Sequence, residues 1–368
     1  MDLDLEGSVP YRFSASYAEA RRKFLAAAAE ATTSYRMPGR GPADEELFVD
    51  TAWFGDRSAT KIGIMVSATH GVEGYCGSAA QLDWLLAGGP LRLRPDEAML
   101  LVHALNPYGF AWDRRVTAEG CDLNRNFVDF AAAVPSNAGY DELAPHLVPP
   151  QLDGGAFEAA EAAIRAFRDR HGELEFQKAR KSGQYRHATG MFFGGFEPTA
   201  SRRTLERIVA EFGVASRDIA IIVDYHTGLG PFGYGELQCE QSSGMDGYQR
   251  ARQIFGESVT SPDLGTSSSV ALNGTQDEYW QRLLGLRHVY VCLEFGTYDA
   301  ESGRRALRDD HWLYAYGKEH VDKQRGKEIR QRVRGHYYPQ AADWKEMVLG
   351  RSRQVQRQVL TGLRRPWS

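Results

Sequence analysis

The chain has 368 residues, of which 42% are hydrophobic and 25% are charged, and it carries a formal net charge of -4. This composition is typical of a globular protein with a large core, which excludes disordered and collagen-like classes. The slight acidity gives no reason to expect a nucleic-acid partner or an anionic membrane surface.

The first residues lack the basic and apolar regions of a secretory signal, and no window reaches the roughly 18–20 apolar residues of a membrane helix. We therefore expect a cytoplasmic protein that acts on a small molecule or peptide, and its oligomeric state stays open. The cysteines form no CxxC pair, which favours reduced, buried thiols over a disulfide framework. They are Cys76, Cys121, Cys239 and Cys292.

An Ala-, Glu- and Arg-rich segment, Ser16 to Thr32, is expected to form the first helix. Continuous apolar runs follow it, and their length and Val/Ile content are typical of strands buried on both faces. These runs are Lys61–Gly71, Ala98–Pro107, Asp218–Gly228 and Arg287–Thr297. Helical patterns separate them, at Gly74–Ala87, Gly155–Arg170, Arg202–Phe212 and Ala306–Arg325.

Strands that alternate with helices predict a three-layer α/β/α fold around a central mixed, mainly parallel sheet. We expect one catalytic domain over residues 1–368, with its core at about 50–330. The region 130–200 interrupts the alternation and is interpreted as an elaboration over one end of the sheet, without a core of its own. The basic C-terminal segment is expected to be a helical extension that docks on the body.

Ionisable residues end three of the apolar runs. His70 and Glu73 stand three apart in THGVEG, and His226 lies in VDYHTG. Each motif alone is weak, since HxxE arises readily by chance and a lone His after a strand more often forms a structural hydrogen bond. Because ligands collect at the carboxyl ends of parallel strands, the three are expected together. Two nitrogens and a carboxylate are the ligands of a catalytic zinc with an open position for water.

The fourth run places Glu294 at the end of an otherwise apolar strand, where an unpaired carboxylate is costly. A structural salt bridge would explain it in isolation. Beside a zinc-activated water, the better explanation is a base that accepts the water's proton. The sequence offers no obvious second set of ligands for a second metal ion.

The second run leads into the loop AWDRRVTAEGCDLNRNF, which concentrates Arg114, Arg115, Asp122, Asn124 and Arg125. Two guanidinium groups beside a metal can have different roles toward a substrate. One can polarise a carbonyl oxygen while the other binds a substrate carboxylate with its two-pronged fork.

At this point the chain resembles the zinc carboxypeptidases of the carboxypeptidase A type and their relatives, the succinylglutamate desuccinylases and aspartoacylases. The resemblance spans Lys61 to Thr297, with the motifs HGVEG, NPYGF, RRVTAEGCDLNRNF, DYHTG and LEFGT in the family's order. The GQYRHATGMFFGG and DYHTGLG stretches are most similar to an uncharacterised bacterial subgroup.

The resemblance implies that His70, Glu73 and His226 hold one Zn²⁺. Asp122 would support a zinc-bound imidazole, and Glu294 would be the general base.

The same resemblance implies that Asn124 and Arg125 bind the substrate carboxylate. The family's carbonyl-polarising arginine lies ten positions before the second of these, which selects Arg115 over Arg114. The flexible tyrosine of the digestive enzymes has no well-spaced match, and Tyr279 is the nearest candidate.

The implied function is zinc-dependent hydrolysis of an amide beside a free carboxylate, as in a metallocarboxypeptidase. The first alternative is a deacylase of N-acyl amino acids, which uses the same constellation. The second alternative belongs to another class, a non-catalytic metal- or ligand-binding module on the same fold. No nucleic-acid or membrane partner is expected.

Overall fold

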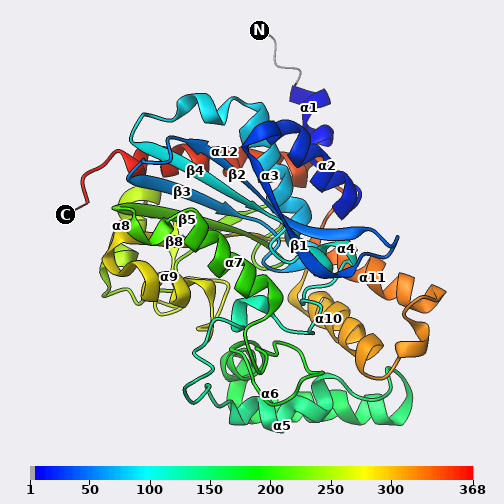
Figure 1. The fold of residues 1–368 in the computed structure, drawn as a ribbon. Helices are drawn as coiled ribbons and strands as arrows, with labels where there is room; N and C mark the ends of the chain where they lie inside the picture. The colour runs from blue at the N-terminus through cyan, green and yellow to red at the C-terminus, as the bar shows by residue number, and fades with distance from the viewer. Residues whose placement is uncertain (1–4, 368) are drawn as a thin grey trace.

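The computed structural model describes residues 5–367, in which one eight-stranded sheet runs through the molecule (Figure 1). The strand order is β1-β2-β4-β3-β5-β8-β6-β7. The central strands β4, β3, β5 and β8 are parallel, and antiparallel pairs flank them. The strands are β1 Thr32–Arg40, β2 Glu46–Gly55, β3 Lys61–Val66, β4 Glu97–His103, β5 Ile219–Thr227, β6 Gly235–Gln238, β7 Val259–Thr260 and β8 His288–Phe295.

Helices cover both faces of this sheet, which confirms the expected α/β/α architecture. One face carries α3, α8 and α12, with α2 packed against α3, while α7 and α9 lie on the other (Figure 1). These helices are α2 Tyr17–Ala28, α3 Gly74–Leu86, α7 Ala200–Glu211, α8 Asp246–Phe255, α9 Gln276–Leu284 and α12 Ala342–Leu363. Two short helices complete this part, α1 Leu5–Arg12 and α4 Pro107–Ala111.

Each of the four predicted apolar runs contains a central strand, but the strands are shorter than the runs. The first run ends as a strand at Val66 and the second at His103, because the residues after them turn away to build loops. The first helix also ends early, at Ala28. Its start is fixed by the N-cap Ser16, whose Oγ accepts from Glu19 N (3.2 Å), while the Glu19 carboxylate accepts from Ala15 N just before the cap (2.7 Å).

The elaboration lies across one end of the sheet and contains α5 Ala138–Leu147 and α6 Gly154–Lys181, which is interrupted at Gly172. Its apolar side chains form a second hydrophobic cluster with α10 Ala300–Ala315 and α11 Gln324–Tyr337. The single helix predicted over Ala306–Arg325 is in fact the end of α10 and the start of α11, separated by a turn.

The C-terminal helix α12 docks on the sheet as expected. Trp344 is fully buried, and its indole Nε1 donates to Gly296 O at 2.9 Å, just after β8. The prediction for the cysteines is also confirmed, since all four are buried and free.

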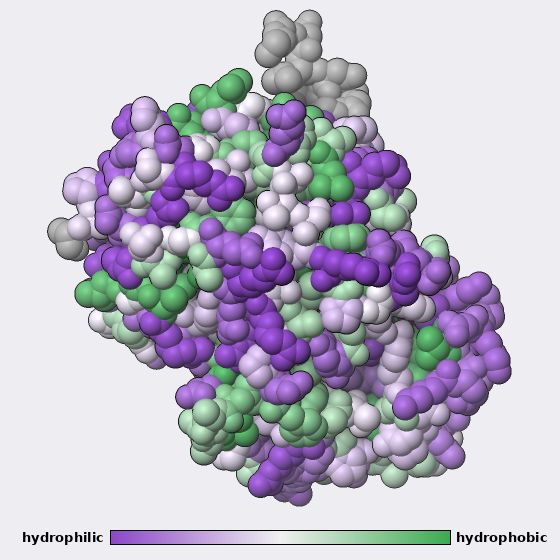
Figure 2. Space-filling view, in the orientation of Figure 1, coloured by the Kyte–Doolittle hydropathy of each residue, from purple (hydrophilic) through white to green (hydrophobic). Residues whose placement is uncertain are grey.

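Among residues 5–367, no helix combines the length and apolar character needed to cross a bilayer. The face in Figure 2 is mostly hydrophilic, with small apolar areas between charged side chains.

Candidate metal centre

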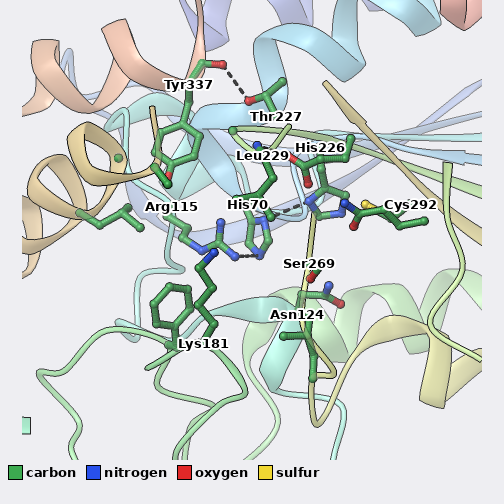
Figure 3. A pocket seen from close by; sticks show the side chains of 18 of the residues that line it. His70, Arg115, Asn124, Lys181, His226, Thr227, Leu229, Ser269, Cys292 and Tyr337 are labelled. Carbon is green, nitrogen blue, oxygen red and sulfur yellow. Dashed lines mark hydrogen bonds between the residues drawn. The ribbon is translucent and has the colours of Figure 1, made fainter. Parts of the chain in front are cut away.

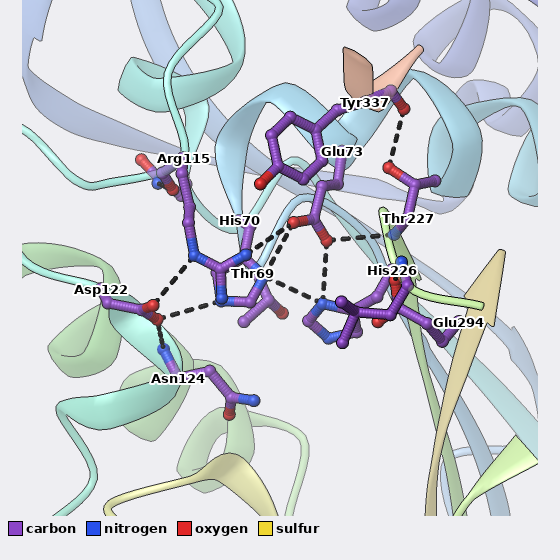
Figure 4. Close-up of polar contacts among 12 residues, drawn as sticks. Thr69, His70, Glu73, Arg115, Asp122, Asn124, His226, Thr227, Glu294 and Tyr337 are labelled. Atoms are coloured by element: carbon purple, nitrogen blue, oxygen red, sulfur yellow. Dashed lines mark hydrogen bonds and ion pairs between the residues drawn. The ribbon is translucent and has the colours of Figure 1, made fainter. Parts of the chain in front are cut away.

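The candidate ligands and base stand at the carboxyl ends of three neighbouring strands (Figure 4). His70 follows β3 in extended conformation, and Glu73 ends the short 3-10 turn Gly71–Glu73. In the β5–β8 ladder His226 pairs directly with Glu294. The parallel register therefore places an imidazole and a carboxylate one strand spacing apart.

Close main-chain contacts position the turn that carries His70. Gly71 N donates to Arg115 O at 3.1 Å, and Val72 N donates to Arg114 O at 2.8 Å. A Cβ added at Gly71 would lie 2.1 Å from the carbonyl carbon of Gly109. Only glycine allows the turn to approach the main chain of α4 this closely.

The three candidate ligands present their donor atoms to one point. His70 Nδ1 lies 3.0 Å from His226 Nδ1 and 3.1 Å from Glu73 Oε1, and His226 Nδ1 lies 3.0 Å from Glu73 Oε2. All three residues are at most 4% exposed. Zinc bonds of about 2.0–2.1 Å in a tetrahedron separate ligand atoms by roughly 3.3 Å. The residues therefore fit a zinc ion.

Buried carboxylates face the outer nitrogens of both imidazoles. His70 Nε2 lies 3.0 Å from Asp122 Oδ1, in hydrogen-bonding geometry. His226 Nε2 lies 2.9 Å from Asp224 Oδ2 but is not aligned for a hydrogen bond. With its proton on Nε2 toward Asp122, His70 turns the Nδ1 lone pair inward. Carboxylates in these places orient metal ligands.

Arg115 is buried beside this cluster and is held by its carboxylates. Its Nε donates to Asp122 Oδ2 and its Nη1 donates to Glu73 Oε1, both at 3.0 Å. Its Nη2 lies 2.8 Å from His70 Nε2, which cannot accept from it while donating to Asp122. The neighbouring Arg114 points elsewhere, with its Nε 2.9 Å from Asp310 Oδ1.

Glu294 faces the ligand cluster and is 6% exposed. Its Oε1 accepts a hydrogen bond from Leu229 N at 3.0 Å. With only the protein's own charges around it, burial and repulsion from Glu73 raise the pKa of Glu294 to about 8. A divalent cation at the cluster would oppose both effects and favour the ionised form.

Asn124 and Arg125 also lie in the cleft, on the turn after Asp122. Asn124 Oδ1 accepts from Gln276 N at 2.8 Å, which leaves its amide nitrogen as the group able to donate to a ligand. Arg125 donates through Nε to Lys181 O at 2.9 Å and through Nη1 to Asn124 O at 2.8 Å. Burial lowers the pKa of Arg125.

These groups line one cleft (Figure 3). Phe192 has a left-handed backbone conformation, with a φ of 56°. The centroid of its ring lies 5.4 Å from the guanidinium carbon of Arg115 and 5.7 Å from that of Arg125. The cleft thus brings together His70, His226, Glu294 and the two arginines predicted from the sequence. Glu73 and Asp122 stand directly behind them.

A family model described as "Protein of unknown function (DUF2817)" matches residues 13–351. The chain belongs to this family. No curated protein sequence matches it.

Several solved structures are similar to this DUF2817 chain. One is carboxypeptidase A from Helicoverpa armigera, with 13% identity, coverage of 88% of this chain and 74% of that one, and a TM-score of 0.44. Bovine thrombin-activatable fibrinolysis inhibitor, in complex with tick carboxypeptidase inhibitor, has 11% identity, coverage of 90% and 100%, and a TM-score of 0.46. An aspartoacylase family protein from Mesorhizobium loti has 15% identity, coverage of 78% and 66%, and a TM-score of 0.36.

Three residues close to the candidate ligands were among those that sequence reasoning missed. Asp224 stands two positions before His226 on β5, so strand alternation puts both on one side and could have indicated it. Cys292 likewise precedes Glu294 by two, and with His226 these form a second group whose ligand atoms lie within 4.8 Å. That group shares His226 with the first set, so it does not supply an independent second site.

The third missed residue is Tyr337, which ends α11 and lines the cleft (Figure 3). Its carbonyl oxygen accepts from Thr227 Oγ1 at 2.7 Å. Tyr337 lies far from the motifs in the sequence, so no local pattern indicated that it would line the cleft. Tyr279 lies on α9, where its ring centroid is 5.6 Å from that of Phe127, and it does not line the cleft.

Proposed function

We propose that this chain is a zinc-dependent hydrolase that cleaves an amide bond next to a free carboxylate, most simply as a metallocarboxypeptidase. The observation that carries the proposal is the convergence of the inner nitrogens of His70 and His226 with the Glu73 carboxylate, at 3.0–3.1 Å. A buried carboxylate, Glu294, faces the same point. A structural salt bridge does not explain Glu294, since its hydrogen bond comes from a main-chain amide.

His70, Glu73 and His226 would hold the zinc, which when bound supplies an activated water and a Lewis acid for the scissile carbonyl. Glu294 would take the proton of the water and return it to the leaving amine. The ionised carboxylate is the form needed for the first of these steps.

Two arginines would orient the substrate and stabilise charge. Polarisation of the carbonyl requires a hydrogen-bond donor beside the metal. Arg115 stands in that place and would donate to the developing oxyanion. Arg125 and the Asn124 amide nitrogen would bind the free carboxylate, so that remote binding energy holds the amide in place. An N-acyl amino acid presents the same amide and carboxylate, so a deacylase is the other form that this proposal can take.

The first test is the metal content of the purified protein together with the variant Glu294→Gln. We expect one zinc per chain by elemental analysis, and loss of activity on chelation. The variant should keep its zinc and lose about 10²–10⁴-fold in kcat. Full turnover in Glu294→Gln would refute the mechanism. A protein without zinc that functions equally well in chelator would favour a binding module instead.

Comparing substrates separates the two forms of the reaction. Blocked dipeptides, longer peptides and N-acyl amino acids should be assayed with the same zinc-loaded protein. Higher kcat/KM on peptides supports a carboxypeptidase, whereas turnover confined to N-acyl amino acids supports a deacylase.

A further inference from the structure

The cleft contains cationic side chains that no carboxylate neutralises. Arg115 is paired with Asp122 and Glu73, and Arg304 is paired with Glu161 and Glu301. Among the described residues, no ion pair forms with three other cations of the cleft. These are Arg125, Arg180 and Lys181.

Arg180 is the most unusual of the three, because it is only 3% exposed. Its Nη2 donates to Gln177 Oε1 at 2.9 Å, and its buried Nε has no hydrogen-bond partner. Burial, with repulsion from Arg304, lowers the pKa of Arg180 to about 10. A buried guanidinium without a counter-ion is destabilising in the free protein, which suggests that a ligand supplies the counter-ion.

Lys181, the next residue on α6, extends its amine into the cleft toward Arg115 and His70 (Figure 3). Within the part of the chain that the structure describes, this amine has no hydrogen bond or ion pair. Burial and the charges of Arg180 and Arg115 lower its pKa to about 7. An anion bound there would raise this pKa and favour the charged form.

The acidic residues of the cleft do not neutralise this pair. Glu294 faces the metal ligands, and Glu240 has Asp277 and Arg125 as charged neighbours, where burial and the Asp277 charge raise its pKa to about 7. Neither is within ion-pair distance of Arg180 or Lys181. Glu301, whose charge also acts on Arg180, is ion-paired with Arg304 and Arg305 instead. Since Arg125 alone suffices for one carboxylate, two further cations exceed what a substrate with a single anionic group needs.

We propose that Arg180 and Lys181 form a second anion subsite, so that the preferred substrate carries an acidic group in addition to the carboxylate held by Arg125. This inference rests on the proposed function, and it assigns the substrate to the dicarboxylates, such as an amide of an acidic amino acid. The elaboration, through the C-terminal end of α6, would then set the selectivity of the site.

The kinetic test uses N-acetyl-Ala-Glu against N-acetyl-Ala-Gln, and N-acetyl-Glu-Ala against N-acetyl-Gln-Ala. These pairs place a carboxylate or a neutral amide on either side of the scissile bond. For one pair we expect kcat/KM to favour the acid by about 10–100-fold, as charge-assisted hydrogen bonds allow. Arg180→Gln and Lys181→Met should each reduce that ratio toward one. The control Lys178→Gln should keep it, because Lys178 lies on the same helix with an exposed side chain.

Three results would overturn the inference. The first is a ratio near one for both pairs in the unaltered protein, and the second is a ratio that survives in both cleft variants. The third is a preference for N-acetyl-Ala-Lys over N-acetyl-Ala-Gln, which would assign the cleft to a cation near Glu240.

A binding measurement separates this inference from the hydrolase proposal. Calorimetry on the full chain should compare glutarate, which has two carboxylates, with butyrate, which has one. We expect at least 10-fold tighter binding of glutarate, lost in Arg180→Gln and Lys181→Met and kept in Lys178→Gln. If glutarate binds in this way while no amide is cleaved, the subsite stands and the hydrolase fails. If amides are cleaved while glutarate binds no better than butyrate, the subsite fails and the hydrolase stands.

Discussion

Replacement of the adjacent residues Arg114 and Arg115 by methionine should affect different properties. The first should lower stability, and the second should lower activity. Arg114 is 4% and Asp310 1% exposed as side chains, and Arg114 Nε lies 2.9 Å and 3.0 Å from the two Asp310 oxygens. The guanidinium carbon also lies 3.4 Å from the Tyr314 ring centroid. Removing one partner of such a buried pair leaves the other charge uncompensated, at about 3–5 kcal/mol. Arg114→Met should therefore lower the free energy of unfolding by that amount.

Arg115→Met should mainly lower activity. Asp122 keeps hydrogen bonds from His70 and from Asn124 N, so the stability loss should be smaller than in Arg114→Met. Loss of a donor to the developing oxyanion should reduce kcat by about 10²–10³-fold.

The assay combines urea unfolding of the zinc-loaded proteins with kcat per folded molecule. The double variant Arg114→Met/Asp310→Leu is the control, because removal of both charges should recover much of the lost stability. If Arg114→Met unfolds within about 1 kcal/mol of the unaltered protein, the buried pair contributes little and our reasoning fails. If kcat falls as much in Arg114→Met as in Arg115→Met, the assignment of a structural role to Arg114 and a role in activity to Arg115 is wrong.

Further expectations concern the ligand supports and the core. Asp224→Asn should weaken zinc binding about 10–100-fold in chelator competition, whereas unchanged affinity would show that this carboxylate does not support His226. Gly71→Ala should cost about 3 kcal/mol in denaturant unfolding, since its Cβ would meet the Gly109 main chain at 2.1 Å; a neutral effect would contradict that contact. Burial lowers the pKa of His103 to about 4, so stability should be complete above pH 6.5 and fall by about 3 kcal/mol as the pH drops to 4. Replacement of His103 by Gln should flatten that pH profile, and an unchanged slope would assign it to other groups.

The sequence was informative where local pattern and tertiary structure agree. Continuous apolar runs identified β3, β4, β5 and β8, because strands buried on both faces must be apolar throughout. The edge strand β1 gave no such signal, since most of its residues are partly or fully exposed. The motif residues converged for the same reason, because carboxyl ends of parallel strands share one edge of the sheet.

Contacts from distant parts of the chain were beyond sequence reasoning. Tyr337 reaches the cleft from α11, and its approach depends on how α10 and α11 pack against the elaboration. Arg180 and Lys181 lie beyond the helical pattern recognised at Gly155–Arg170, and only the fold shows that their side chains line the cleft without a carboxylate partner. The second hydrophobic cluster was missed because four separate helices contribute to it.

Because His226 pairs directly with Glu294 in the β5–β8 ladder, the site forms only when these two strands are in the correct register. A slip of one residue in either strand would turn that side chain to the opposite face of the sheet. A compact but misregistered chain would then lack a proposed metal ligand or the proposed base, even if its helix content were normal. Stoichiometric zinc uptake would therefore distinguish properly assembled molecules from trapped ones in a refolding experiment, where circular dichroism would count both alike.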